Sequence, residues 1–337
     1  MSKKNKRTEN KISKKHAIVK ALFPNFIYKK ILKVYQKPKV KNIKRRKSLS
    51  MNIKDPVIKK KVIIEGVDGF AKTLKLRCDH VFDIAAFIMP IGATKETKFE
   101  DVPVYADSSA LTELEYDFVF ITTLDFCEKQ REYNTLYNVP YEKMISMRYT
   151  HQPGKQTSFL AFANEIAMRK IEGSIVELGV DTGGTAKYLN LYYPDRTLYL
   201  FDTFSGFDKR DIEFERTKRP MTDSLANYYN MRSKVEDVLN KMFFKEKCVV
   251  KQGYFPESLD GLEDTFAFVH IDCDLEKPVL AALEYFYPRL NSGGIICVHD
   301  FHNPLFGGVR KVVRDFCIER NIAYSPNTAF EGAIICK

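Results

Sequence analysis

The sequence predicts an α/β protein with two Rossmann-like units in tandem. Its 337 residues are about the length of two domains. Short apolar runs bounded by glycine or acidic residues, which are typical of buried parallel strands, alternate with stretches of helical periodicity. In each half, the first such run ends in a glycine-containing turn, at Gly66 and again at Gly179. No run of 18 or more apolar residues is present, so no membrane-spanning helix is expected.

Residues 1–58 are expected to form a basic arm that contains an amphipathic helix and a linker. Residues 1–61 hold 22 Lys and Arg against two acidic residues, a net charge of +20, whereas the rest of the chain carries 32 basic and 41 acidic residues, a net charge of −9. Because the folded body is mildly acidic, a nucleic-acid groove on it is not expected.

Apolar residues recur among lysines from residue 15 to about residue 37, which predicts basic amphipathic helices broken near Pro24. Three interpretations remain open: peripheral membrane contact through residues 15–47, a helix packed on its own protein, or a solvated arm. The seven cysteines are odd in number and lack CxxC pairs, which indicates reduced thiols. We therefore expect a cytoplasmic protein, with the inner membrane face as the place of any peripheral contact.

Residues 59–150 are expected to form a small Rossmann-like domain. This stretch resembles the small domain that precedes acyltransferases and other sugar-modification enzymes. Asp68 and Ala71 stand where that family has further glycines, and Met89 stands where an acidic residue usually ends the second strand. These departures weaken a nucleotide site, so a structural or oligomerisation role is favoured and a homo-oligomer is expected. The predicted strands are Lys61–Glu65, Val81–Ile88, Val102–Tyr105 and Tyr116–Ile121.

Residues 151–337 are expected to form a second, doubly wound α/β domain. It begins with a helix from Ser158 to about Lys170, and further helices are expected around Leu280–Phe286 and Val309–Glu319. The predicted strands are Ile175–Leu178, Leu198–Phe201, Cys248–Lys251, Ala267–Ile271 and Ile295–Val298, with an antiparallel edge pair near Ala323–Tyr324 and Ala333–Cys336.

The first strand of this domain leads into a glycine loop with the features of a cofactor site. Gly179 and Gly183 allow a ligand to approach the backbone closely. Asp202 ends the second strand, 25 residues after Glu177, where an acid can accept both hydroxyls of a ribose. A carboxylate at Glu177 would repel a pyrophosphate but favours a cationic amino-acid ligand. The loop therefore predicts S-adenosylmethionine rather than a dinucleotide.

Four further polar side chains follow two neighbouring strands of the predicted sheet. Asp272 and Asp274 come after one strand, and His299 and Asp300 come after the next. Ligands of open α/β sheets bind beyond the carboxyl ends of the strands, so these side chains should converge on one crevice. Carboxylates at such short separations repel one another, which makes a cation the expected occupant.

Five motifs in order give the second domain a specific resemblance, which covers roughly residues 160–337. They are ELGVDTGG (177–184), LFDTFSGF (200–207), GYFP (253–256), HIDCDL (270–275) and GGIICVHDF (293–301). Together they resemble the macrocin O-methyltransferase family, which methylates sugar hydroxyls of macrolide and aminocoumarin antibiotics. The resemblance implies a class I methyltransferase fold, S-adenosylmethionine, magnesium-dependent O-methylation and a cofactor contact at Gly253.

The resemblance also implies individual roles at the strand ends. Asp272 and Asp300 would be metal ligands, and Asp274 would be the general base. His299 replaces a carboxylate of the family pattern. Magnesium prefers oxygen ligands and imidazole suits transition metals. Either His299 is a weak ligand or an outer group beside Mg²⁺, or the site favours Mn²⁺.

The expected function is metal-dependent transfer of a methyl group from S-adenosylmethionine to a sugar hydroxyl. The acceptor would be a glycan, a nucleotide-sugar or a glycosylated metabolite. Residues 203–229 are long, polar and charged, as in loops that cover an active site. Their basic side chains, Arg210, Arg216, Lys218 and Arg219, either meet an anionic substrate group or lie on a solvated helix face. The alternative is a non-catalytic binding protein of the same fold that acts through its basic arm.

Overall fold

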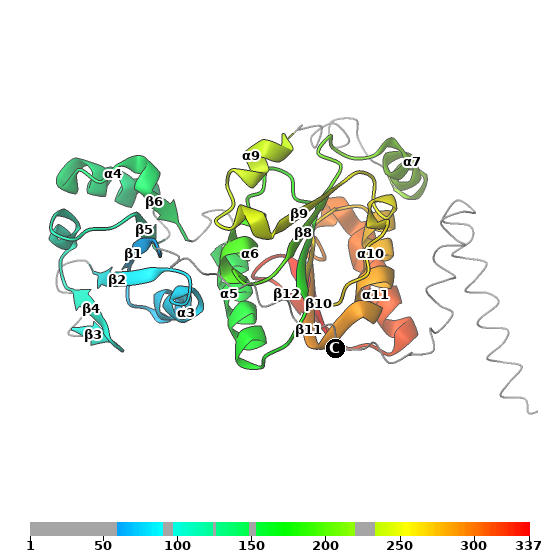
Figure 1. The fold of residues 1–337 in the computed structure, drawn as a ribbon. Coiled ribbons are helices and arrows are strands. Elements are labelled where there is room, and N and C mark those ends of the chain that lie inside the picture. The colour runs from blue at the N-terminus through cyan, green and yellow to red at the C-terminus, as the bar shows by residue number, and fades with distance from the viewer. Residues whose placement is uncertain (1–58, 90–96, 124–125, 148–152, 220–232) are drawn as a thin grey trace, which may run out of the picture. The chain divides into compact units, whose positions relative to one another are not determined.

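A computed structural model of the chain describes residues 59–89, 97–123, 126–147, 153–219 and 233–337. The predicted amphipathic arm, residues 1–58, lies outside these ranges. Residues 203–229, here called the cover segment, are described up to residue 219, and the rest of the segment lies outside. The described residues belong to one compact unit, Ile58–Lys337, which contains two sheets (Figure 1).

The first sheet has six strands in the order β3-β4-β2-β1-β5-β6. All neighbours are parallel except the pair β3 and β4. The elements of this part are β1 (Lys61–Glu65), α3 (Gly69–Cys78), β2 (Asp83–Ile88), β3 (Lys98–Phe99), β4 (Val102–Tyr105), β5 (Phe118–Ile121), α4 (Phe126–Tyr137) and β6 (Met144–Ser146).

Both faces of this sheet are covered, because side chains of β1 alternate between two apolar clusters. Val62 and Ile64 pack with Leu74 of α3, whereas Ile63 packs with Tyr133 of α4. A strand buried on both faces has the continuous apolar sequence seen here. At the end of β1, the Glu65 carboxylate accepts backbone N–H bonds of 3.0 Å and 3.1 Å from the turn after β5.

The second sheet has seven strands in the order β12-β13-β11-β10-β7-β8-β9. The strands from β11 to β9 are parallel, and β13 and β12 add an antiparallel edge, as predicted. The strands are β7 (Ser174–Leu178), β8 (Leu198–Asp202), β9 (Cys248–Gln252), β10 (Phe266–Ile271), β11 (Leu290–Val298), β12 (Tyr324–Asn327) and β13 (Gly332–Cys336).

Helices flank the second sheet on both sides, with α5 and α6 on one face and α10 and α11 on the other (Figure 1). A doubly wound α/β sheet is therefore confirmed. Short 3₁₀ turns connect several of these elements. The helices are α5 (Pro153–Met168), α6 (Ala186–Tyr192), α7 (Lys209–Lys218), α9 (Val235–Leu239), α10 (Glu276–Arg289) and α11 (Gly307–Arg320).

The strand order reverses between β7 and β10, and this switch point is where such sheets bind ligands. In the register, Leu178 lies beside Ile271, and Ile271 lies beside Val298. The residues that follow these strands therefore meet at one edge. Asp272 N–H donates to the Leu178 carbonyl at 2.8 Å, and His299 N–H donates to the Ile271 carbonyl at 2.8 Å.

Candidate active site

A cavity of about 620 Å³ opens at the carboxyl ends of β7, β8, β10 and β11. Its volume is in the range of small-molecule sites. The cavity brings together eight of the nine side chains and glycines that the sequence singles out: Glu177, Gly179, Asp202, Gly253, Asp272, Asp274, His299 and Asp300.

The ninth residue, Gly183, turns away from the cavity. A Cβ at this position would lie 2.9 Å from the Val238 side chain of α9, whereas Gly184 faces open space and lines the cavity. Gly179 serves a different purpose: with φ of +88°, its Cβ would lie 1.9 Å from the Asp272 carbonyl oxygen. Gly179 therefore permits close packing of the loop against the end of β10, whereas Gly184 leaves room for a ligand.

Asp202 holds the glycine loop in place. Its Oδ2 accepts the N–H groups of Val180 at 2.7 Å and Asp181 at 2.8 Å. Its Oδ1 accepts the N–H of Phe204 at 2.7 Å, and its carbonyl accepts the N–H of Gly253. A carboxylate has about four acceptor sites, so Asp202 retains capacity for a ribose hydroxyl.

Glu177 is 1% exposed, and burial raises its pKa well above the usual range. Its Oε1 lies 3.2 Å from Nδ1 of His270, which is its register neighbour on β10. Its Oε2 is buried without a hydrogen-bond partner in the described structure. Buried polar atoms are normally paired, so this oxygen points to a donor on a ligand.

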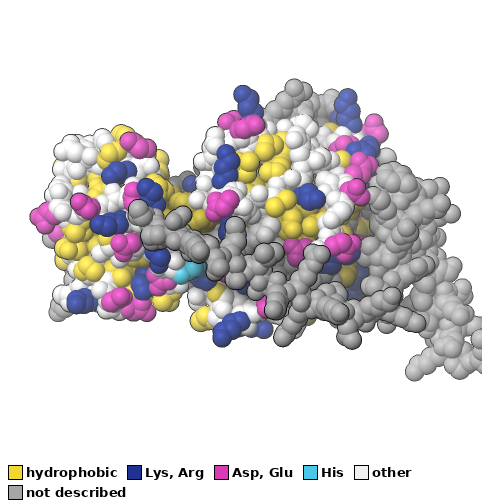
Figure 2. All heavy atoms as spheres, in the orientation of Figure 1, with side chains coloured by type: hydrophobic (Ala, Val, Ile, Leu, Met, Phe, Trp, Pro, Cys, Tyr) yellow, Lys and Arg dark blue, Asp and Glu magenta, His cyan; other side chains and the backbone are white. Residues whose placement is uncertain are grey.

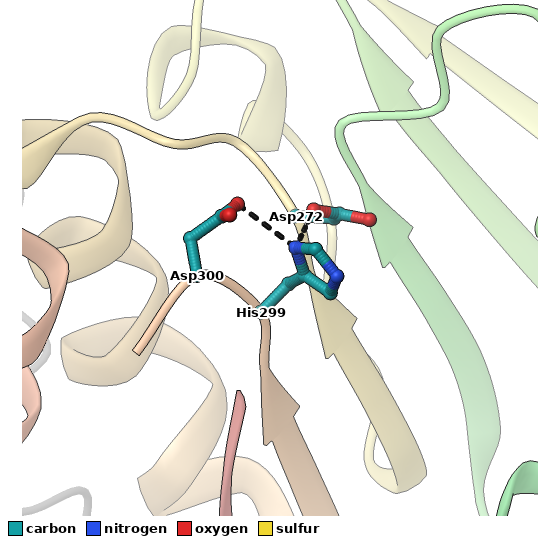
Figure 3. A group of neighbouring side chains, drawn as sticks. All are labelled: Asp272, His299 and Asp300. Carbon is teal, nitrogen blue, oxygen red and sulfur yellow. Dashed lines mark hydrogen bonds and ion pairs between the residues drawn. The ribbon is translucent and has the colours of Figure 1, made fainter. Parts of the chain in front are cut away.

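Asp272, His299 and Asp300 offer three ligand atoms within 4.8 Å of one another. Figure 3 shows the His299 ring between the two carboxylates. Its Nδ1 lies 3.0 Å from Oδ1 of Asp272 and 2.9 Å from Oδ2 of Asp300. Ligands of one octahedral ion at about 2.1 Å lie about 3–4 Å apart, so the group fits a divalent cation.

The charges in this group stabilise one another. Burial alone would lower the pKa of His299, but Asp272 and Asp300 raise it to about 9. Burial would likewise raise the pKa of Asp272, yet His299 and Lys155 bring it well below its usual range. In the protein alone, a charged imidazole therefore lies where the sequence analysis expects a cation.

Asp274 and Asp300 both adopt left-handed backbone conformations, with φ of +62° and +59°. Such strain in a non-glycine residue is typical of functional positions. Burial, followed by a hydrogen bond shared with Asp300, raises the pKa of Asp274 well above its usual range. Asn303 fixes the other side of Asp300, since its Nδ2 donates to Oδ1 at 2.8 Å.

The cavity residues that are absent from the sequence-based set include a buried pair, Lys155 and Gln156. Lys155 and Gln156, in the first turn of α5, are 4% and 2% exposed and line the cavity. Lys155 Nζ lies 2.8 Å from Oδ2 of Asp272, and Gln156 Oε1 is buried without a hydrogen-bond partner in the described residues. A Lys-Gln pair ahead of an apolar helix matches no motif, so only the packing of α5 against the sheet shows these residues.

The described part of the cover segment contains α7, and its arginines are paired. Arg210 binds Asp208 at 2.8 Å and Glu257 at 3.0 Å. Arg219 forms ion pairs with Glu276 at 2.6 Å and with Glu215 of α7 at 3.0 Å. Neither guanidinium lines the cavity. These pairs do not support the interpretation in which the two arginines receive an anionic substrate group.

Comparisons with known proteins agree with this geometry. A model of the macrocin O-methyltransferase family (TylF) matches residues 153–329. No curated protein sequence matches the chain. Structures of similar fold include the O-methyltransferase NovP, with 19% identity over 55% of this chain and 79% of that chain and a TM-score of 0.46. The calicheamicin methyltransferase CalS11 has 22% identity over 63% and 91% of the two chains and a TM-score of 0.47.

Another structure of similar fold is the O-methyltransferase TomG from Streptomyces achromogenes, solved in complex with SAM. It is 12% identical over 63% of this chain and 90% of that chain, with a TM-score of 0.36. The family model covers more than half of the 337 residues, and the family motifs line one cavity of a class I methyltransferase sheet. The chain therefore belongs to the macrocin O-methyltransferase family and is an S-adenosylmethionine-dependent O-methyltransferase.

Proposed function

We propose that this protein transfers the methyl group of S-adenosylmethionine to a sugar hydroxyl, and that the transfer requires a divalent cation. One observation carries the proposal: a single cavity contains two groups of residues. Glu177 and Asp202 form the wall that would bind the cofactor, and Asp272, His299 and Asp300 form the group that would bind the cation. The acceptor would be a glycan, a nucleotide-sugar or a glycosylated metabolite, which fits the family and the resemblance of residues 59–150 to the small domain of sugar-modification enzymes.

Two buried acceptor atoms fit the amino-acid end of the cofactor. Oε2 of Glu177 and Oε1 of Gln156 are both buried in the cavity wall without hydrogen-bond partners among the described residues. An ammonium group supplies the donors that both oxygens lack. Asp202 would accept a ribose hydroxyl, and the exposed backbone at Gly184 would allow close approach of the ligand.

The cation would be held by Asp272 and Asp300, with His299 as a ligand or beside it. When bound, it would lower the pKa of the acceptor hydroxyl and orient it, while S-adenosylmethionine would supply the methyl group. Asp274 would accept the hydroxyl proton, since it lines the same cavity beside the cation-binding group. Magnesium is the expected ion, and an imidazole ligand would favour manganese.

Radiolabelled methyl transfer tests the proposal directly. The purified protein is incubated with labelled S-adenosylmethionine and a panel of glycosides and nucleotide-sugars. We expect label in at least one sugar product, loss of transfer in EDTA, and recovery with Mg²⁺ or Mn²⁺. Undiminished transfer in a metal-free assay would refute the cation requirement, and transfer to non-sugar acceptors alone would refute the substrate class.

A further inference from the structure

Lys155 is the only lysine or arginine among the described residues that line the cavity, against nine carboxylate side chains. Its side chain enters from the first turn of α5 and is almost completely buried. A buried ammonium is costly unless it is paired. Lys155 is paired with the residue proposed as the central metal ligand, Asp272.

The two oxygens of Asp272 have separate partners. Oδ2 lies 2.8 Å from Lys155 Nζ, and Oδ1 lies 3.0 Å from His299 Nδ1, on the side of Asp300. The carboxylate is therefore held between the Lys155 ammonium and the His299 imidazole. This leaves one oxygen of Asp272 for the metal and fixes its direction.

We propose that Lys155 is a built-in counter-ion that shares Asp272 with the metal. The inference rests on the proposed function, because it concerns the same cation site. Without a metal, Lys155 partly neutralises the carboxylate cluster. The repulsion among the carboxylates of the folded site is therefore reduced. Because like charges repel across a few ångströms of protein interior, the same ammonium weakens metal binding. Lys155 is thus a positioning residue that sets the metal affinity.

A purely structural ion pair between α5 and β10 has a different consequence. Removing such a pair would lower the stability of the protein. Metal affinity would stay constant, or it would fall because the Asp272 carboxylate is no longer held in place. The counter-ion role predicts the opposite direction, in which removing the positive charge strengthens metal binding. The sign of the change in affinity therefore separates the two roles.

The test measures Mn²⁺ binding to the full-length protein without cofactor or acceptor, by calorimetry and by electron paramagnetic resonance. Lys155→Met removes the charge and keeps a long apolar stem, and Lys155→Arg keeps the charge. Lys75→Met is the matched control, since Lys75 of α3 is a similarly buried lysine that pairs with Asp79 and Glu100, away from the cavity. Thermal unfolding is recorded with and without Mn²⁺.

We expect Lys155→Met to bind Mn²⁺ at least tenfold more tightly than the wild type, and to gain more thermal stability from Mn²⁺. Lys155→Arg and Lys75→Met should keep wild-type affinity. If Lys155→Met is unfolded without metal, added Mn²⁺ should refold it, and failure to refold would overturn the role. Unchanged or weaker binding with EDTA-sensitive methyl transfer would overturn the role of Lys155 alone. Absence of Mn²⁺ binding in every variant would overturn the metal site as well.

Discussion

The His299 side chain, which replaces a carboxylate of the family pattern, lies at the centre of the charge balance in the site. Its Nδ1 contacts Asp272 and Asp300 at about equal distances, 3.0 Å and 2.9 Å. A charged imidazole there can stabilise both carboxylates until a metal displaces its proton. Metal binding at this group would therefore include proton release, which a three-carboxylate site would largely lack.

Asp274→Asn tests the general base. The amide keeps the shape of the side chain but cannot accept the hydroxyl proton, so turnover should fall by about 10²–10⁴-fold. Affinity for S-adenosylmethionine should stay unchanged, because the cofactor wall at Glu177 is separate. Single-turnover kinetics and calorimetry measure the two quantities. If Mn²⁺ affinity falls together with turnover, Asp274 is a metal ligand rather than the base.

Asp211→Asn should stabilise the protein at neutral pH. The usual pKa of this carboxyl, 3.8, is raised to about 6 in the fold, mainly by burial. Between these two values the folded state binds a proton that the unfolded state has lost. Stability therefore falls as the pH rises from about 4 to 6, by at most about 3 kcal/mol.

The asparagine variant lacks this cost, and its Oδ1 can still accept the 2.9 Å bond from the Tyr254 hydroxyl. We expect its free energy of unfolding in urea to exceed that of the wild type by about 1–3 kcal/mol at pH 7.5. The difference should vanish near pH 4. A variant that is less stable at pH 7.5 would show that the ionised carboxylate is favourable in the fold.

At the scale of elements, the cofactor loop between β7 and α6 depends on glycines with different tasks. Gly179→Ala would place a methyl group against the Asp272 carbonyl in a left-handed backbone conformation. Overpacking and backbone strain together should cost about 3 kcal/mol or more. Gly184→Ala is the control, because nothing lies within 4 Å of its Cβ position. Chemical denaturation of both variants measures the difference, and equal stability would contradict the close packing.

Most elements could be predicted from the sequence because their signals are local. Apolar runs place the parallel strands within a few residues of their observed bounds, and Glu177, Asp202 and Asp272 follow from their positions at strand ends. The short strands β3 and β6 carry no such pattern. Lys155 could not be predicted because its role depends on a contact across 117 residues of sequence. The inward direction of Gly184, rather than Gly183, likewise depends on where α9 packs.

At the scale of the molecule, the two sheets share one apolar core. A single buried cluster includes Val62 of the first sheet and Phe268 of the second. Phe243 contacts Phe82 and Phe120 at ring-centroid distances of 6.3 Å and 6.1 Å. Arg77 also donates to the Tyr192 carbonyl at 2.9 Å. These contacts favour a structural role for the first domain, and the expected homo-oligomer remains a prediction.

The basic arm gives a prediction about location. In the view of Figure 2, acidic and basic side chains are interspersed over the described surface, whereas residues 1–61 carry a net charge of +20. Each Lys or Arg near an anionic membrane contributes about 1 kcal/mol, reduced by salt. None of the described helices is long and apolar enough to cross a membrane. Contact of residues 15–47 with an anionic membrane face stays a prediction, alongside a helix packed on the protein and a solvated arm.

Removal of residues 1–50 should leave methyl transfer to a dissolved acceptor unchanged, because every described residue that lines the cavity lies at position 155 or beyond. The full-length protein should sediment with anionic vesicles at low salt and be released at high salt. The truncated protein should stay in the supernatant under both conditions. If the full-length protein also stays in the supernatant at low salt, the membrane interpretation fails. The two other interpretations, a helix packed on its own protein and a solvated arm, then remain.

The close approach of Gly179 to the Asp272 carbonyl joins the cofactor loop to the strand end that would bind the metal. A backbone shift at Asp272 would thus reach the loop that would hold the cofactor. Two ligands coupled in this way obey thermodynamic reciprocity: the factor by which the cation tightens the cofactor equals the factor by which the cofactor tightens the cation. At a low cellular concentration of free cation, abundant cofactor would then recruit the metal, and the enzyme would assemble both ligands together.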